Sequence, residues 1–425
     1  MPCGFCRLIL LTSALLGMLA ANASSQSKTP KSGEFDWPQW QGPKRQANCE
    51  ETGLFKNWST IGPPLAWQAK QLGIGHSTPS VAGGHIYGMS QRGKEDGVWC
   101  LDEATGKEIW FKSIGVAREV QYGGSRCTPT VDGERLFALT VGGDLACMEC
   151  ATGKIIWKKN LTADFGGKMM SQWGYSESPL VDGDKLICSP GSVRAAIVAL
   201  NKKTGGVVWK SEVADCGGAA YSSAVISEAA GTRQYVNFLG KCLVGVDAAS
   251  GKLLWRYDKP RYRVAVIPTP LVKDDYIFAS ASYDAGSALL KIEKKGKGLE
   301  AKQVYFLAAN VFQNHHGGVV LVGDHLYGGH GQNRGEPTCI DFLTGKIAWK
   351  EKAPASGSAA YLYADGHLIV RYEDGSITLQ GVDPAKLVIK AKFRPPYVSD
   401  EPSWAHPVVA NGRLYIRDQG GAHVL

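Results

Sequence analysis

Short runs of alternating apolar and polar residues, each ended by a glycine-centred turn, recur along almost the whole chain. The run at Ile86–Tyr87 is followed at regular intervals by Leu136–Phe137, Leu186–Ile187 and Ile277–Phe278. Runs of this length and alternation predict β-strands, and no stretch shows the 3.6-residue period of an amphipathic helix. The pattern therefore predicts an all-β protein built from a repeated unit.

Each repeated unit ends in a turn of the form Thr-Gly-Lys followed by a strand that closes on Trp. A small residue, often followed by Pro, opens the next unit, as in Thr78–Val81. Four strands in a unit of about 45 residues are typical of a β-propeller blade. The five copies of the turn and its strand are Thr105–Trp110, Thr152–Trp157, Thr204–Trp209, Ser250–Trp255 and Thr344–Trp349.

The positions of these Trp residues give the number of blades. Two units separate Trp255 from Trp349, and the less regular one carries Tyr305 where Trp is expected. A seventh unit runs from about Ala360 to Phe393, and an eighth begins at His406 but has no fourth strand of its own. An N-terminal strand around Trp67 has no blade of its own, so we expect it to complete the eighth blade and close the ring.

Composition and the N-terminus indicate an exported protein. Arg7, the apolar stretch Leu8–Ala20 and the Ala21–Ala23 cleavage site form the pattern of a signal peptide. We expect a signal peptide at 1–23, a polar spacer at 24–36 and one propeller domain at 37–425, a periplasmic or otherwise extracytoplasmic monomer without a membrane span. An uncleaved anchor is the alternative. The charge of +8 is spread over 425 residues, which argues against nucleic-acid binding.

The cysteines divide into two groups by their place in the repeat. Cys100, Cys147 and Cys339 each stand five residues before the turn Thr, where a small, buried side chain is needed. Cys147-x-x-Cys150 is also the spacing of a redox pair, but its first Cys belongs to the structural set. Cys127 and Cys216 lie in loops before inner strands, and we expect them to be the reactive or bridged cysteines.

The repeated phrase Ala-x-Asp-x-x-Thr-Gly-Lys-x-x-Trp resembles the PQQ-binding-like repeat of the quinoprotein alcohol dehydrogenase-like β-propellers. The resemblance extends from about Trp37 to the C-terminus and implies an eight-bladed propeller whose repeat Trp residues pack between blades. Quinone-dependent dehydrogenases of this kind imply PQQ and Ca²⁺ as cofactors. Their ring disulfide needs adjacent cysteines, and this sequence has none; it also has no C-x-x-C-H motif for haem.

Candidate ligand-binding residues are those that break the repeat just before each inner strand, where the chain reaches the mouth of the channel. Arginines suit an anionic ligand, and aromatic faces suit a planar ring. His315, His316 and Glu177 are the candidate catalytic groups, and Glu177 and Asn314 are candidate Ca²⁺ ligands. Because adjacent strand residues point to opposite faces, the two histidines are not expected to share a metal ion. The candidate cofactor-binding residues are Arg126, Trp173, Tyr175, Tyr221, Arg261, Arg263, Asn314, Trp404 and His406.

Two functions remain open at this level. The first is a quinoprotein-type oxidoreductase, or a ligand-binding derivative of one, that holds a small molecule in the central funnel. The second is a non-catalytic scaffold that binds protein partners at its rim, similar to the scaffold lipoprotein of the outer-membrane assembly machine. A carbohydrate-processing propeller would need two carboxylates at the mouth, and only Glu177 is clearly placed there.

Overall fold

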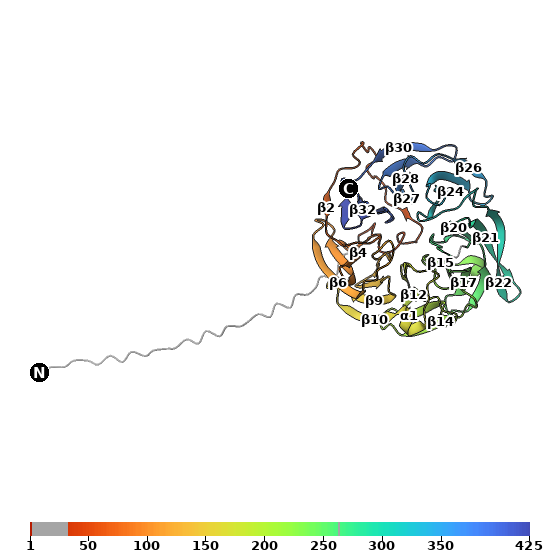
Figure 1. The fold of residues 1–425 in the computed structure, drawn as a ribbon, viewed down its shortest axis with the longest axis horizontal. Coiled ribbons are helices and arrows are strands. Elements are labelled where there is room, and N and C mark those ends of the chain that lie inside the picture. Colours follow the sequence, from red (N-terminus) through yellow and green to blue (C-terminus); the bar gives the residue numbers. More distant parts are fainter. Residues whose placement is uncertain (2–32, 262–263) are drawn as a thin grey trace.

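The computed structural model describes Met1 and residues 33–261 and 264–425. Eight antiparallel sheets of four strands are arranged in a ring around a central channel, and one of them carries a fifth strand (Figure 1). This confirms the prediction of an eight-bladed, all-β propeller. The predicted signal peptide lies outside the described residues apart from Met1. No helix in the described part of the chain is long and apolar enough to cross a membrane.

Every blade runs from the channel outward, so its first strand lines the channel and its second strand packs behind it. The first strands are β3 (Ser80–Ala82), β7 (Thr130–Asp132), β11 (Leu180–Asp182), β15 (Val225–Ser227), β19 (Leu271–Lys273), β23 (Val319–Val322), β27 (Ala359–Ala364) and β31 (Val408–Ala410). The second strands are β4 (His85–Arg92), β8 (Arg135–Leu139), β12 (Lys185–Cys188), β16 (Gln234–Phe238), β20 (Tyr276–Ala281), β24 (His325–His330), β28 (His367–Tyr372) and β32 (Arg413–Asp418).

The third and fourth strands form the outer part of each blade. The third strands are β5 (Glu95–Asp102), β9 (Asp144–Glu149), β13 (Ile197–Asn201), β17 (Leu243–Asp247), β21 (Gly286–Lys295), β25 (Glu336–Asp341), β29 (Ile377–Gly381) and β33 (Gly421–Val424). The fourth strands are β6 (Glu108–Val116), β10 (Ile155–Asn160), β14 (Val207–Ser211), β18 (Leu253–Tyr257), β22 (Gly298–Leu307), β26 (Ile347–Lys350), β30 (Val388–Phe393) and β2 (Trp67–Ala69). The described chain contains only two short helical segments, α1 (Leu161–Phe165) and η1 (Ala229–Gly231).

The N-terminal strand β2 completes the last blade, as the sequence predicts. It pairs antiparallel with β33, and Trp67 lies opposite Val424. Because β33 in turn pairs with β32, the eighth sheet contains four strands drawn from both ends of the described chain. This closure leaves no blade with a missing outer strand, and backbone hydrogen bonds hold the segment that leads into the first blade to the last blade.

The Thr-Gly-Lys turn is explained by the Trp of the preceding blade. A Cβ atom on Gly205 would come within 2.9 Å of the Trp157 ring, and Gly205 has a φ of +72°, so glycine is required there on both counts. The Trp157 indole N–H donates to the carbonyl of Lys202 in the same turn at 3.0 Å. Tyr305 keeps this geometry, since its hydroxyl donates to the carbonyl of Phe342 in the next blade. Trp110, Trp209 and Trp349 donate to the next blade in the same way, which confirms their structural role.

The repeat cysteines lie beneath the same Trp residues. Cys147 faces Trp157 across the β9–β10 pair and is fully buried. The nine cysteines in the described part of the chain are all free and buried, so the expectation that Cys127 and Cys216 are reactive or bridged is wrong. Burial raises the pKa of Cys127 to about 12, which keeps it a thiol that packs as a small apolar group.

A segment that precedes the first blade crosses the channel at the end where first and second strands meet. Trp37 bridges to Val81, and Asn48 pairs with Tyr363 through the short strand β1 (Asn48–Cys49). Between these points Arg45 is buried and donates to the carbonyls of Ser178, Pro179 and Ala224. Residues 36–49 therefore close one end of the channel, a role that the repeat pattern does not reveal.

Candidate functional site

The main candidate site is a cavity of about 320 Å³ at the open end of the channel. Its wall is built by the loops before the inner strands and by the hairpins between second and third strands. Because both kinds of connection lie at the same end of a blade, residues far apart in sequence meet there. The lining residues are Trp40, His76, Thr78, Tyr122, Arg126, Trp173, Ser176, Ser178, Tyr221, Ser223, Ala265, Ile267, Tyr283, His315, His316, Gln332, Asn333, Glu373, Pro402, Trp404 and His406.

Seven of the residues proposed from the sequence line this cavity. They come from five blades, and each stands in the loop before an inner strand, which is the position that singled them out. They are Arg126, Trp173, Tyr221, His315, His316, Trp404 and His406.

Four of the proposed residues lie elsewhere, and Arg263 lies outside the described residues. Glu177 is buried in the wall, where it accepts a hydrogen bond from the amide of Ser189. Tyr175 is also buried, with its hydroxyl donating to the carbonyl of Pro190 at 3.0 Å. The Asn314 amide nitrogen donates to the carbonyls of Gly318 and Gly329, both at 3.0 Å. Arg261 is exposed and donates to the carbonyl of Lys241.

These placements do not form the proposed Ca²⁺ site. The Glu177 carboxylate and the Asn314 amide have their polar atoms committed to different stretches of backbone. Burial raises the pKa of Glu177 to about 7, which further reduces its value as a permanently charged ligand. No group of three or more His, Cys, Asp or Glu side chains suited to a metal ion occurs within the described residues.

Arg126 supplies the positive charge of the cavity. Its guanidinium donates to the carbonyl of Trp173 at 2.6 Å and to that of Tyr122 at 2.6 Å, with a longer bond to Gln121. Burial lowers its pKa, but an arginine stays protonated at neutral pH. Each of these bonds goes to a neutral oxygen, so the described contacts orient the cation without neutralising it. Arg126 is the only Lys or Arg, and Glu373 the only Asp or Glu, among the described residues that line the cavity.

Aromatic rings form much of the wall. Trp404 contacts Tyr122 edge to face, with ring centroids 4.9 Å apart, and Trp173 contacts Tyr221 at 6.2 Å. The indole N–H groups of Trp173 and Trp404 are buried and have no hydrogen-bond partner among the described residues. A buried donor without a partner costs free energy. Two residues of the cavity wall therefore each retain an unsatisfied indole donor.

The paired histidines lie together, against the expectation from strand alternation. His315 and His316 belong to the loop before β23, where alternation does not apply, and their rings stack at a centroid distance of 3.7 Å. Both line the cavity. Burial lowers the pKa of His315 to about 4 and that of His316 well below its usual value, so both rings are neutral near pH 7.

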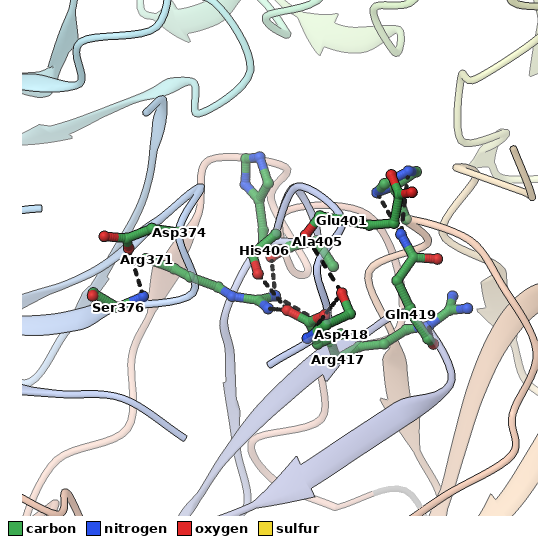
Figure 2. A network of polar contacts seen from close by, with 12 residues as sticks. Arg371, Asp374, Ser376, Glu401, Ala405, His406, Arg417, Asp418 and Gln419 are labelled. Carbon is green, nitrogen blue, oxygen red and sulfur yellow. Dashed lines mark hydrogen bonds and ion pairs between the residues drawn. The ribbon is translucent and has the colours of Figure 1, made fainter. Parts of the chain in front are cut away.

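A buried polar network holds the Trp404–His406 loop in place (Figure 2). Arg371 forms a fully buried ion pair with Asp418 at 2.6 Å and donates to the carbonyl of Ala405 at 2.8 Å. Asp418 also accepts from the hydroxyl of Ser403. Because these bonds fix the backbone on both sides of Trp404, the network sets the position of one wall of the cavity.

Sequence reasoning missed Tyr122, which stands in a loop before an inner strand, and two further groups of lining residues. Tyr283, Asn333 and Glu373 belong to hairpins between second and third strands, whereas all the candidates predicted from the sequence lie in the loops before inner strands. Trp40 comes from the segment that closes the channel; its ring packs on His406 at 4.6 Å, and its indole donates to Thr269. Two sequence signals point to these residues. The hairpins differ from blade to blade, and aromatic residues stand ahead of the first blade.

The fold and this cavity define an eight-bladed propeller of PQQ-like repeats with room for a small molecule. Residues 95–351 and 298–390 match the family model described as outer membrane protein assembly factor BamB. The two matches span more than half of the chain, so the chain belongs to this family. No curated protein matches the chain.

Solved structures share the fold at low sequence identity. A quinohemoprotein alcohol dehydrogenase from Comamonas testosteroni aligns with a TM-score of 0.63 at 14% identity over 92% of this chain and 80% of that one. A europium-containing methanol dehydrogenase aligns with a TM-score of 0.65 at 14% identity, covering 91% and 90%. The computationally designed protein Ika8 aligns with a TM-score of 0.54 at 8% identity, covering 84% and 99%. At these identities the likeness shows the fold alone.

Proposed function

We propose that this protein binds a planar, anionic small molecule in the channel cavity, as a ligand-binding derivative of the quinoprotein dehydrogenases. The observation that carries the proposal is Arg126, a cation oriented by carbonyl oxygens within an aromatic-walled cavity. A guanidinium offers a planar set of donors to a carboxylate, and Trp rings cover planar molecules. Two structures that share the fold are described as dehydrogenases, one of them quinohemoprotein, which makes a quinone the first ligand to test.

PQQ fits part of this site. Its ring system suits the faces of Trp173 and Trp404, and Arg126 suits one of its carboxylates. When bound, PQQ would supply an electron acceptor for alcohol oxidation. His316 would be the residue to take a proton, because Nε2 of His315 is already bonded to the hydroxyl of Tyr283. The described residues do not offer the Ca²⁺ site that would accompany it, since Glu177 and Asn314 are committed elsewhere.

Calorimetric titration of the mature protein with PQQ, with and without Ca²⁺, tests the proposal. We expect binding that Ca²⁺ does not strengthen. Arg126→Gln should weaken it by about 1.5–3 kcal/mol, the range for a hydrogen bond to a charged group. Arg261→Gln is the matched control, because Arg261 is exposed outside the cavity. Dye-linked alcohol oxidation by the loaded protein then reports whether binding leads to catalysis. No heat with PQQ would contradict the quinone form of the proposal.

Export is part of the proposal and rests on residues 1–23. The mature chain should begin near Ser24, because the Ala21–Ala23 site follows a short apolar stretch. Intact-mass measurement of the protein from the extracytoplasmic fraction checks this prediction. A mass that still includes residues 1–23 would show that the segment is an uncleaved anchor.

Protein binding at the rim is the second candidate, and a repeated surface feature favours it. The residue before the blade Trp is an exposed aliphatic side chain in several outer strands, with Ile109 at 46%, Ile156 at 41% and Val208 at 49% exposure. These strands also have one edge without a neighbour. A photo-crosslinking residue at position 156 should capture one defined partner in the producing cell if the rim is a docking surface, and none if it is not.

A further inference from the structure

A chain of three hydrogen-bonded side chains reaches the cavity from two neighbouring blades. The hydroxyl of Tyr283 lies 3.0 Å from Nε2 of His315, and Nδ1 of His315 lies 3.0 Å from Oδ1 of Asn333. All three residues line the cavity. Tyr283 has a φ of +57°, a conformation that non-glycine residues rarely adopt, and the turn is held by Gln313.

The surroundings of Nδ1 determine the tautomer of His315. Asn333 presents its carbonyl oxygen, which can only accept a hydrogen bond. The hydroxyl of Ser358, 3.4 Å from Nδ1, already donates to the carbonyl of Gln332 at 3.1 Å, so it too can only accept from the ring. Nδ1 therefore carries the hydrogen. The imidazole is neutral near pH 7, and Nε2 keeps its lone pair.

The tautomer of His315 determines whether the Tyr283 hydroxyl donates or accepts the hydrogen bond between them. With a lone pair on Nε2, the phenol must donate its hydrogen to His315. A phenolic oxygen that donates its one hydrogen still has two acceptor lone pairs, so Tyr283 offers a ligand an acceptor rather than a donor. Arg126 offers a ligand only hydrogen-bond donors, because a guanidinium has no acceptor. Arg126 precedes the inner strand of the second blade, and Tyr283 lies in the hairpin between the second and third strands of the fifth blade. Two blades separate them, so they face the cavity from different sides.

We propose that the cavity selects an aromatic acid that carries a hydroxyl or amino group, with its carboxylate bound by Arg126 and its hydroxyl or amino hydrogen donated to Tyr283. His315, Asn333 and Ser358 are positioning residues that keep Tyr283 in the accepting state. This inference rests on the proposed binding of a planar anion and specifies the chemistry of the other end of the ligand.

A pair of matched probes, 4-hydroxybenzoate and 4-methoxybenzoate, tests the inference by calorimetry at pH 7. The two differ in whether the para oxygen can donate. We expect the hydroxy acid to bind the wild-type protein about tenfold more tightly, the scale of one hydrogen bond in a buried site. Tyr283→Phe should remove this preference while leaving the affinity for the methoxy acid almost unchanged. Tyr257→Phe is the control, since Tyr257 lies on an outer strand with its hydroxyl bonded to Gln303.

The outcomes separate this inference from the proposed function. Equal binding of the two acids by the wild-type protein, or a preference that Tyr283→Phe retains, would overturn the role of Tyr283 while leaving anion binding intact. Binding of PQQ but of neither acid would overturn the hydroxy-acid inference alone. If PQQ and both acids fail to bind, the proposed function fails and the inference fails with it.

Discussion

Burial of a cation does not by itself mark a ligand site in this protein. Arg45, Arg371 and Arg417 are all buried, and each is bonded to backbone carbonyls from neighbouring blades. Arg371 also has the Asp418 carboxylate. Their bonds join separate blades, so their role is structural. Arg126 has similar partners, but it borders the cavity, and that position makes it a candidate for binding a ligand.

The orientation of a single side chain also decides which residues of one loop reach the cavity. Trp173 and Ser176 line it, whereas Tyr175 and Glu177 point into the wall. The sequence shows that this loop departs from the repeat, but it does not show the backbone rotation that sends neighbouring side chains to opposite sides. For this reason the sequence identified the loop correctly, but it did not show that Tyr175 and Glu177 point away from the cavity.

At the scale of the blade, the Trp and the turn Gly form one interlocking contact. The Trp of one blade covers the Gly of the next, so the outer parts of neighbouring blades are in direct contact. Where Trp is replaced, the substitute keeps the bond, as Tyr305 does with Phe342. Trp255 is the exception, since its indole donates to Gln234 within its own blade.

Removal of one such Trp should weaken the whole ring. We expect Trp157→Ala to lower the free energy of unfolding by about 3 kcal/mol, because a large aromatic that covers Gly205 and bonds to Lys202 is lost. Ile156→Ala is the matched control on the same strand; its side chain is exposed, so the change should stay within about 0.5 kcal/mol. Chemical denaturation measures both. An unchanged midpoint for Trp157→Ala would contradict the structural role of the repeat Trp.

The blades could be predicted from the sequence because the repeat is regular. Part of the candidate site could be predicted because its residues depart from the repeat. Eight blades and the closing strand at Trp67 follow from regular spacing, because each unit must bury the same faces. The loops before inner strands pointed to Arg126 and Trp404 in the same way. Trp40 could not be placed, because the segment that carries it belongs to no repeat and is positioned only by contacts with many blades.

At the scale of the whole molecule, the channel has two different ends. The segment at residues 36–49 covers one end and joins blades that are distant in the ring. The other end is hollowed into the cavity, whose wall is polar and aromatic. Because the histidines of this wall are enclosed by both the ring and the covering segment, they are kept neutral, and this links the stability of the molecule to pH.

Acidification should therefore destabilise the protein between about pH 6.5 and pH 4. Burial lowers the pKa of His76 to about 3 and that of His315, His330 and His406 to about 4, so the unfolded chain binds more protons in this range. Two buried carboxyls act in the opposite direction, since burial raises the pKa of Glu177 to about 7 and that of Asp96 to about 6.

The histidines outnumber these carboxyls, so we expect the free energy of unfolding to fall by about 2 kcal/mol for each pH unit of acidification. Glu177→Gln removes one opposing group and should make the loss steeper. Melting temperatures measured from pH 7 to pH 4 test this prediction. A melting temperature that stays constant or rises as the pH falls would show that these histidines are not buried in their neutral form.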